Sequence, residues 1–126
     1  SAVLQAPDLK EIAENFLRNW FPAAMLDAGE PAVEPFRSML VATDPQGLAG
    51  SYAAVRDTDM RRTIALIPRP TLVIAGRYDT VTALSHSQVM ADTIPNARLL
   101  ILPAVHLPNI EYPAEYLEAV LAFLRD

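Results

Sequence analysis

The stretch Pro70-Thr-Leu-Val-Ile-Ala-Gly76-Arg-Tyr-Asp79 decides the fold class of this chain, together with Ala97-Arg-Leu-Leu-Ile-Leu-Pro103 and the His106 that follows. Both stretches contain short, unbroken apolar runs bounded by proline or glycine. Such runs are typical of strands in a parallel sheet that helices cover on both faces. Ligands of such sheets bind beyond the carboxyl ends of the strands, so we expect Asp79 and His106 to emerge there side by side.

The composition is that of a globular, mildly acidic protein. The 126 residues are 52% apolar and carry a formal net charge of −5, which predicts a packed core in one domain. No cluster of lysine and arginine is present to neutralise phosphates, so a nucleic-acid partner is not expected. The lack of cysteine excludes disulfides and thiolate chemistry. No apolar run has the length of a membrane span, and we expect a cytoplasmic protein without membrane contact.

Residues 1–62 are expected to form a helical region. Apolar residues recur at helical spacing through each segment, and proline or a capping side chain marks the boundaries. The expected helices run from a capping box at Asp8 to Pro22, from Pro31 to Val41, from the N-cap Asp44 to Asp57, and briefly from about Asp59.

Residues 63–126 are expected to alternate strand, helix, strand, helix. We expect Thr82 to cap the first of these helices, Pro113 to open the last one, and Glu111 to cap it. Two parallel strands alone do not make an independently stable sheet. Either further strands come from another chain, or this chain is the C-terminal part of something larger.

Asp79 and His106 together suit a hydrolytic active site. A carboxylate after one strand can accept a hydrogen bond from one imidazole nitrogen and fix the tautomer, which leaves the other nitrogen free to take a proton from a nucleophile. The order of acid before histidine near the end of the chain is the α/β-hydrolase order, in which the nucleophile comes first.

Three segments carry a resemblance to a known family. The Pro70 to Asp79 stretch resembles the acid-bearing strand and turn of α/β-hydrolases, and His106-Leu-Pro-Asn-Ile-Glu111-Tyr-Pro113 resembles their histidine loop. Ala53-Ala-Val-Arg56-Asp57-Thr-Asp59 is similar to the end of the helical cap in 3-oxoadipate enol-lactonases, which act in aromatic degradation by the β-ketoadipate pathway. The resemblance covers the chain from about Asp8. It implies an α/β fold, namely a C-terminal fragment of an α/β-hydrolase with a helical cap followed by two parallel strand-helix units.

The sequence departs from the family pattern at the nucleophile. The elbow Gly-x-Ser-x-Gly is absent, and none of the serines has that context: Ser1, Ser38, Ser51, Ser85 and Ser87. Val105 also stands where the superfamily often has glycine, and Pro108 where lactonases often have serine. By resemblance, the chain is the cap and C-terminal half of an enzyme. A missing N-terminal half or a second copy of the chain would bring the serine.

Each candidate residue has a plainer alternative. Asp79 is either the triad acid or a turn former, and His106 is either the general base or an ordinary loop histidine. Trp20 either lines a lactone pocket under the cap or packs in a helical core. Arg56 either holds a substrate carboxylate or forms a surface ion pair with Asp57.

The resemblance implies hydrolysis of a small-molecule ester or lactone, with 3-oxoadipate enol-lactone favoured. No cofactor is implied, and no side chains have metal-ligand spacing. We expect no meaningful activity from this chain alone. The alternative function is a non-catalytic interaction module that oligomerises or binds a partner through its exposed sheet edge.

Overall fold

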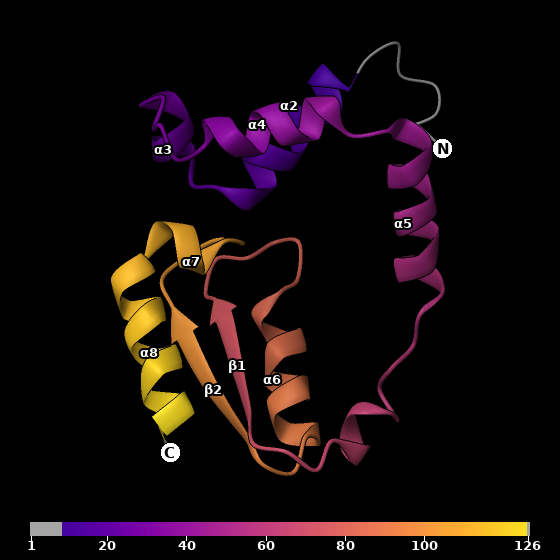
Figure 1. Cartoon of the computed structure of the whole chain (residues 1–126), viewed down its shortest axis with the longest axis vertical. Helices are drawn as coiled ribbons and strands as arrows, with labels where there is room; N and C mark the ends of the chain where they lie inside the picture. Colours follow the sequence, from indigo (N-terminus) through magenta and orange to yellow (C-terminus); the bar gives the residue numbers. More distant parts are fainter. Residues whose placement is uncertain (1–8, 126) are drawn as a thin grey trace. The chain divides into compact units, whose positions relative to one another are not determined.

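The computed structural model describes residues 9–125, and its elements are labelled in Figure 1. The chain divides into two compact units. The first contains Ala23–Asp59 and the residues before it up to Arg18, and the second contains Asn19–Pro22 and the residues from Met60 onward. Each unit is described by itself. Across the described residues, no helix has the length and apolar character needed to span a membrane.

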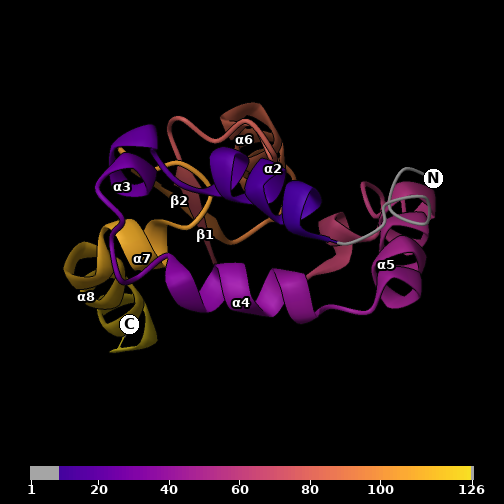
Figure 2. The same ribbon diagram turned by 90° about the horizontal axis from the view of Figure 1, so that it is seen from above.

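The first unit is helical, and Figure 2 shows α4 leading into α5 through a short link. Its helices are α2 (Lys10–Trp20), whose last two residues belong to the second unit, α3 (Ala23–Asp27), α4 (Glu34–Ala42) and α5 (Pro45–Asp57). Helix α2 ends shortly before Pro22, as predicted, because proline cannot continue a helix beyond its first turn. The predicted capping residue Asp8 lies outside the described residues.

Two details of these helices differ from the expectation. Helix α4 begins at Glu34 rather than at Pro31 because Pro35 lacks an N–H and fits only within the first turn. Helix α3, a single short turn after Pro22, was not predicted. Its five residues, four of them apolar, are too short a segment to show a helical period.

The start of α5 is confirmed. The Asp44 carboxylate caps the helix by accepting a hydrogen bond from the Gly47 backbone N–H at 2.7 Å. Within this unit, the rings of Phe16 and Tyr52 stack with their centroids 6.0 Å apart. The buried apolar side chains of the unit are Leu9, Ala13, Leu17, Val33 and Leu40.

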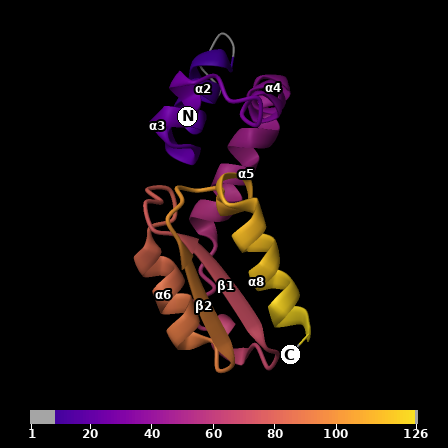
Figure 3. The same cartoon turned by 90° about the vertical axis from the view of Figure 1, so that its left-hand side faces the viewer.

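The second unit contains the sheet. Its elements are a 3-10 turn (Ile64–Leu66), β1 (Thr71–Gly76), α6 (Leu84–Thr93), β2 (Ala97–Leu102), α7 (Pro108–Glu111) and α8 (Pro113–Arg125). The strands pair in parallel, with Thr71 opposite Ala97 and Gly76 opposite Leu102, and Figure 3 shows α6 and α8 on opposite sides of them. The prediction of a short helix from about Asp59 is wrong. Only the 3-10 turn forms, because Pro68 disfavours helical geometry in the residue before it.

The two faces of the sheet are covered unequally. Val73 and Ala75 are buried on the face that packs against α6. On the other face, Leu72 and Ile74 are only half-buried, and they border a hollow of about 400 Å³ that α8 lines with Tyr116, Val120 and Phe123. Burial on both faces was expected. On the α6 face it holds for Val73 and Ala75, whereas their β2 neighbours Leu99 and Ile101 are half-buried. In the part of the chain that the structure describes, each strand has a neighbour on one side only.

Two expected caps are wrong. Thr82 does not cap α6, whose N-cap is Ala83, because the Thr82 hydroxyl donates to Asp79 instead. Glu111 does not cap α8. It is the last residue of α7, and its carboxylate accepts a hydrogen bond from the backbone of Val105. In both cases a tertiary partner replaces the local one.

Candidate active site

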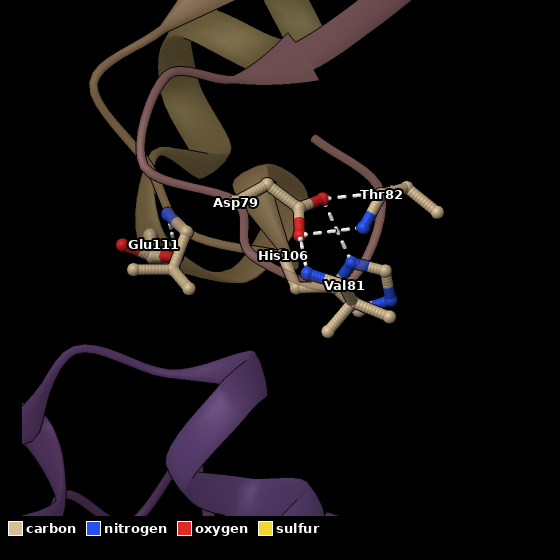
Figure 4. A network of polar contacts seen from close by, with 6 residues as sticks. Asp79, Val81, Thr82, His106 and Glu111 are labelled. Atoms are coloured by element: carbon tan, nitrogen blue, oxygen red, sulfur yellow. Dashed lines mark hydrogen bonds and ion pairs between the residues drawn. The ribbon is translucent and has the colours of Figure 1, made fainter. Parts of the chain in front are cut away.

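The structure brings Asp79 and His106 together beyond the carboxyl ends of the two parallel strands. Asp79 follows β1 through a tight turn, and His106 lies in the loop between β2 and α7. The Asp79 Oδ2 and His106 Nδ1 atoms are 2.9 Å apart (Figure 4). The Asp79 side chain is 7% exposed and the His106 side chain 23%, so the carboxylate is shielded while part of the ring is accessible.

Asp79 accepts three further hydrogen bonds from its own turn. Its Oδ1 accepts from the backbone N–H groups of Val81 at 2.8 Å and Thr82 at 3.0 Å, and its Oδ2 accepts from the Thr82 hydroxyl at 2.8 Å (Figure 4). Burial by itself would raise the pKa of Asp79. The hydrogen bonds from His106, Thr82 and Val81 outweigh it and hold that pKa below its usual value.

The low pKa of Asp79 determines the tautomer of His106. An ionised carboxylate is only an acceptor, so the proton in the contact is carried by Nδ1 of the imidazole. In neutral His106 the unprotonated nitrogen is then Nε2, which is the atom able to take a proton from a nucleophile. The turn-forming and histidine-orienting interpretations of Asp79 are not exclusive, because different lone pairs of one carboxylate make both sets of contacts.

Gly76 permits the close approach of the two loops. A Cβ atom built on Gly76 would lie 1.7 Å from the carbonyl oxygen of Val105 and 2.7 Å from that of Ala104. The Tyr78 N–H donates to the same Ala104 carbonyl at 2.9 Å. Any side chain at position 76 would therefore push the histidine loop away from the acid turn.

Trp20 contacts His106 directly. Its ring stacks on the imidazole with the centroids 6.1 Å apart and the planes at 29°, and its backbone oxygen accepts the His106 N–H at 3.2 Å. Trp20 belongs to the same unit as His106, and it is partly buried. The contact places an aromatic face beside the imidazole.

Arg56 forms an ion pair with Asp57, which is the plainer of the two roles considered for it. Its Nε and Nη2 atoms contact the two carboxylate oxygens of Asp57 at 2.7 and 2.9 Å. Both side chains are well exposed, and this pairing raises the pKa of Arg56 and lowers that of Asp57. Arg56 lies in the first unit, whereas Trp20, Asp79 and His106 lie in the second.

No serine among the described residues lies in a strand-to-helix turn. Ser38, Ser51, Ser85 and Ser87 all lie within helices, and Ser1 is outside the described residues. The Ser51 hydroxyl donates to the Gly47 carbonyl one turn earlier at 3.0 Å. Over residues 9–125, no three acidic, histidine or cysteine side chains gather in a way that would hold a metal ion.

Sequence reasoning missed the roles of Gly76 and Glu111. Both lay inside the quoted motifs, with Gly76 at the end of the first apolar run and Glu111 shortly after the histidine. A glycine at the end of a buried strand is a known sign of close backbone approach. Glu111 gave no comparable signal, because its partner Val105 precedes it in a loop with no regular period.

No family model matches the sequence. Comparison with individual proteins and solved structures finds hydrolases and lactonases. The chain is 30% identical over 117 residues to 3-oxoadipate enol-lactonase 2 of Acinetobacter baylyi, a match covering 93% of this chain and 44% of that protein. A hydrolase from Pseudomonas aeruginosa PA01 is 62% identical with a TM-score of 0.95, covering 98% of this chain and 46% of that one. The enol-lactonase from Burkholderia xenovorans LB400 is 28% identical with a TM-score of 0.91, covering 97% and 47%.

The chain thus spans about half the length of the relatives that it matches. Over that half, the backbone of the chain follows those of the two solved structures closely, and both the sequence and the structure comparison find an enol-lactonase. The chain has the fold of part of an α/β-hydrolase, and its homologues in sequence and structure are α/β-hydrolases that include 3-oxoadipate enol-lactonases.

Proposed function

We propose that this chain supplies the acid and the general base of a Ser-His-Asp triad in a carboxylic-ester or lactone hydrolase. Asp79 is the acid and His106 the base, and the serine comes from polypeptide outside this sequence. The observation that carries the proposal is the 2.9 Å contact between Asp79 and His106 at the carboxyl ends of adjacent parallel strands. The likeness to α/β-hydrolases supports it, since acid and histidine occur here in the α/β-hydrolase order.

In the proposed reaction, Nε2 of His106 accepts the proton of the serine hydroxyl as the serine oxygen attacks the substrate carbonyl carbon. The ionised Asp79 stabilises the imidazolium that forms and keeps the ring in the correct tautomer. His106 then returns the proton to the leaving oxygen, which for an enol-lactone is the enol oxygen of the opened ring. Water attacks the acyl-enzyme with His106 again as base, and the serine regains its proton.

The proposed substrate is a 3-oxoadipate enol-lactone or a closely related ester. It is favoured by two relatives named as enol-lactonases and by the resemblance of the Arg56 segment to their cap. Trp20 is the proposed apolar contact for the substrate, because its ring already lies against the proposed base. The rest of the pocket and the backbone donors for the oxyanion would come from the polypeptide that carries the serine.

Arg56 is the proposed partner of a substrate carboxylate. Asp57 occupies the Nε and Nη2 atoms of this guanidinium, so its negative charge competes with a substrate carboxylate for Arg56. In a chimaera that restores the missing half, Asp57→Asn should therefore lower KM for a carboxylate-bearing lactone and leave KM for the uncharged p-nitrophenyl acetate unchanged. An equal effect on both substrates would remove Arg56 from the proposal.

The proposal is tested by restoring the missing half. The part of the Pseudomonas aeruginosa hydrolase that this chain does not match is fused to it, since 62% identity over nearly the whole chain favours native packing. The chimaera should hydrolyse p-nitrophenyl acetate, whereas the 126-residue chain alone should not. In the chimaera, His106→Ala and Asp79→Asn should each lower kcat by at least about 10³-fold.

His86→Ala is the matched control, because His86 is exposed on α6 and is the other histidine of the chain. That variant should keep full activity. A burst of product from the isolated chain that His106→Ala abolishes would contradict the proposal, because the nucleophile would then lie within this sequence. Full activity of the His106→Ala chimaera would contradict the assigned base.

The second candidate function is the interaction module. It is favoured by the unpaired edge of β1, beside the hollow that Leu72, Ile74 and α8 border. A second copy would add a strand there by β-augmentation. Light scattering coupled to size exclusion separates the candidates: the module predicts twice the 13.8 kDa chain mass at micromolar concentration and no hydrolysis by the chimaera.

A further inference from the structure

The loop that carries His106 is held at three successive residues. Its backbone contacts connect it to three different parts of the second unit. They are Tyr78 N–H to the Ala104 carbonyl at 2.9 Å, Val105 N–H to Glu111 Oε1 at 2.8 Å, and His106 N–H to the Trp20 carbonyl at 3.2 Å. Only one of these contacts is made by a side chain, and that side chain is Glu111 (Figure 4).

We propose that Glu111 is a positioning residue for His106: its carboxylate holds the Val105 N–H and thereby fixes the peptide from which the imidazole projects. The proposal rests on the assignment of His106 as the general base. It adds a residue that acts on the imidazole through the backbone of the loop.

The geometry of Val105 explains why one hydrogen bond has this effect. The Val105 carbonyl is pressed against Gly76, and the Val105 N–H points to Glu111, so both polar groups of this residue have defined neighbours. Loss of the Glu111 acceptor frees the Val105 backbone to rotate and leaves a partly buried N–H without its partner. Rotation at Val105 moves the next residue, which is His106.

The setting of Glu111 agrees with this role. It ends the short helix α7, whose backbone bond from Glu111 N–H to the Leu107 carbonyl at 3.1 Å ties the carboxylate to the same loop. Burial raises the pKa of Glu111, and the hydrogen bond from Val105 only partly offsets this. The carboxyl group of Glu111 is thus partly buried at a cost to its ionised form. Its hydrogen bond from the Val105 N–H gives this position a structural purpose.

The test uses the imidazole resonances of the chain. The sequence contains two histidines, and exposed His86 provides an internal reference in the same spectrum. With ¹⁵N-labelled histidine, the proton on Nδ1 of His106 should give a slowly exchanging downfield signal because Asp79 accepts it. Glu111→Ala should abolish this signal, whereas Glu111→Gln should retain it, since the amide oxygen can accept the same N–H.

Glu115→Ala is the matched control, because Glu115 is an exposed glutamate in the first turn of α8. It should leave the His106 signal unchanged. If Glu111→Ala fails to fold, Glu111→Asp decides the question, because it keeps the charge but withdraws the oxygens by about one C–C bond, roughly 1.5 Å. A folded Glu111→Ala or Glu111→Asp variant with an unchanged His106 signal would overturn the proposal, and so would a Glu111→Gln variant that loses the signal.

Kinetics of the chimaera give a second readout. Glu111→Ala should lower kcat by about 10²-fold with little change in KM, and Glu111→Gln should restore most of it. This outcome is distinguishable from failure of the proposed function. If His106→Ala leaves activity intact while Glu111→Ala still abolishes the His106 signal, then Glu111 positions the loop but His106 is not the base.

Discussion

Substitution of Gly76 by alanine is the sharpest test of how the acid turn and the histidine loop are joined. The added Cβ would lie 1.7 Å from the Val105 carbonyl oxygen and 2.9 Å from the Val105 carbonyl carbon. These are backbone atoms, so no side-chain rotation relieves the overlap. Restoring even a tight contact requires the strand end or the loop to move by more than about 1 Å, since non-bonded carbon contacts are favourable only near 3.5–4.0 Å.

Either movement separates Asp79 from His106. If the loop yields, His106 moves with Val105 and Ala104. If β1 yields, Asp79 moves, because it follows Gly76 after two residues of the turn and the Arg77 N–H loses its 2.8 Å bond to the Leu102 carbonyl. A displacement of this size costs about 10²-fold in kcat where geometry is critical, and overpacking costs about 1–3 kcal/mol of stability.

The assay compares urea unfolding of Gly76→Ala with that of Gly50→Ala. Gly50 lies in α5, where an added Cβ meets no atom within 4 Å, so the same chemical change should stabilise the chain by about 0.5–1 kcal/mol. Gly76→Ala should destabilise it and abolish the His106 Nδ1 proton signal. A Gly76→Ala chain as stable as the wild type, with that signal intact, would refute the reasoning.

Three further predictions concern carboxyl groups. Because the pKa of Asp79 is lowered in the folded chain, its hydrogen-bonded carboxylate stabilises the fold above about pH 4. This contribution is lost as the pH falls through the pKa of the folded state. The difference in unfolding free energy between wild type and Asp79→Asn should therefore shrink on acidification. The raised pKa of Glu111 has the opposite effect on the pH dependence, because ionisation of this carboxyl group destabilises the folded chain. Glu111→Gln stays neutral, so its unfolding free energy should rise relative to that of wild type between about pH 4 and 7. Urea unfolding at each pH measures this difference. Asp44→Ala should cost about 1 kcal/mol through loss of the α5 cap, while Asp44→Asn should cost little, and equal unfolding midpoints for the two variants would contradict this.

The strands and the polar residues after them were predictable because their signals are local. An apolar run bounded by proline and glycine needs no knowledge of distant residues, and β1 and β2 both lie within the stretches in which strands were predicted. The cap of α5 and the start of α8 at Pro113 were predictable for the same reason. The position of Asp79 next to His106 followed from one rule of parallel sheets, once both strands were assigned.

The features that the sequence did not predict depend on tertiary partners. Thr82 has the chemistry of an N-cap, but the Asp79 carboxylate is a stronger acceptor within reach of its hydroxyl. Glu111 precedes a helix and so resembles a cap, but it is used by the loop before it. The contact of Trp20 with His106 connects residues far apart in the chain, and no periodic pattern in either segment encodes it.

The structure also explains how a proposed half-site can be fully formed without its nucleophile. The contacts described above that orient the imidazole all lie within the second unit and involve the Asp79 turn, Gly76, Glu111 and Trp20. The tautomer of His106 is therefore set by the fold of this unit and does not wait for a serine. The hollow beside α8 reaches Pro108 and Asn109 of α7 but is lined by neither Asp79 nor His106, so a segment that covers it need not displace the pair. It follows that the His106 Nδ1 signal should be the same in the isolated chain and in the chimaera, and that only turnover should distinguish them.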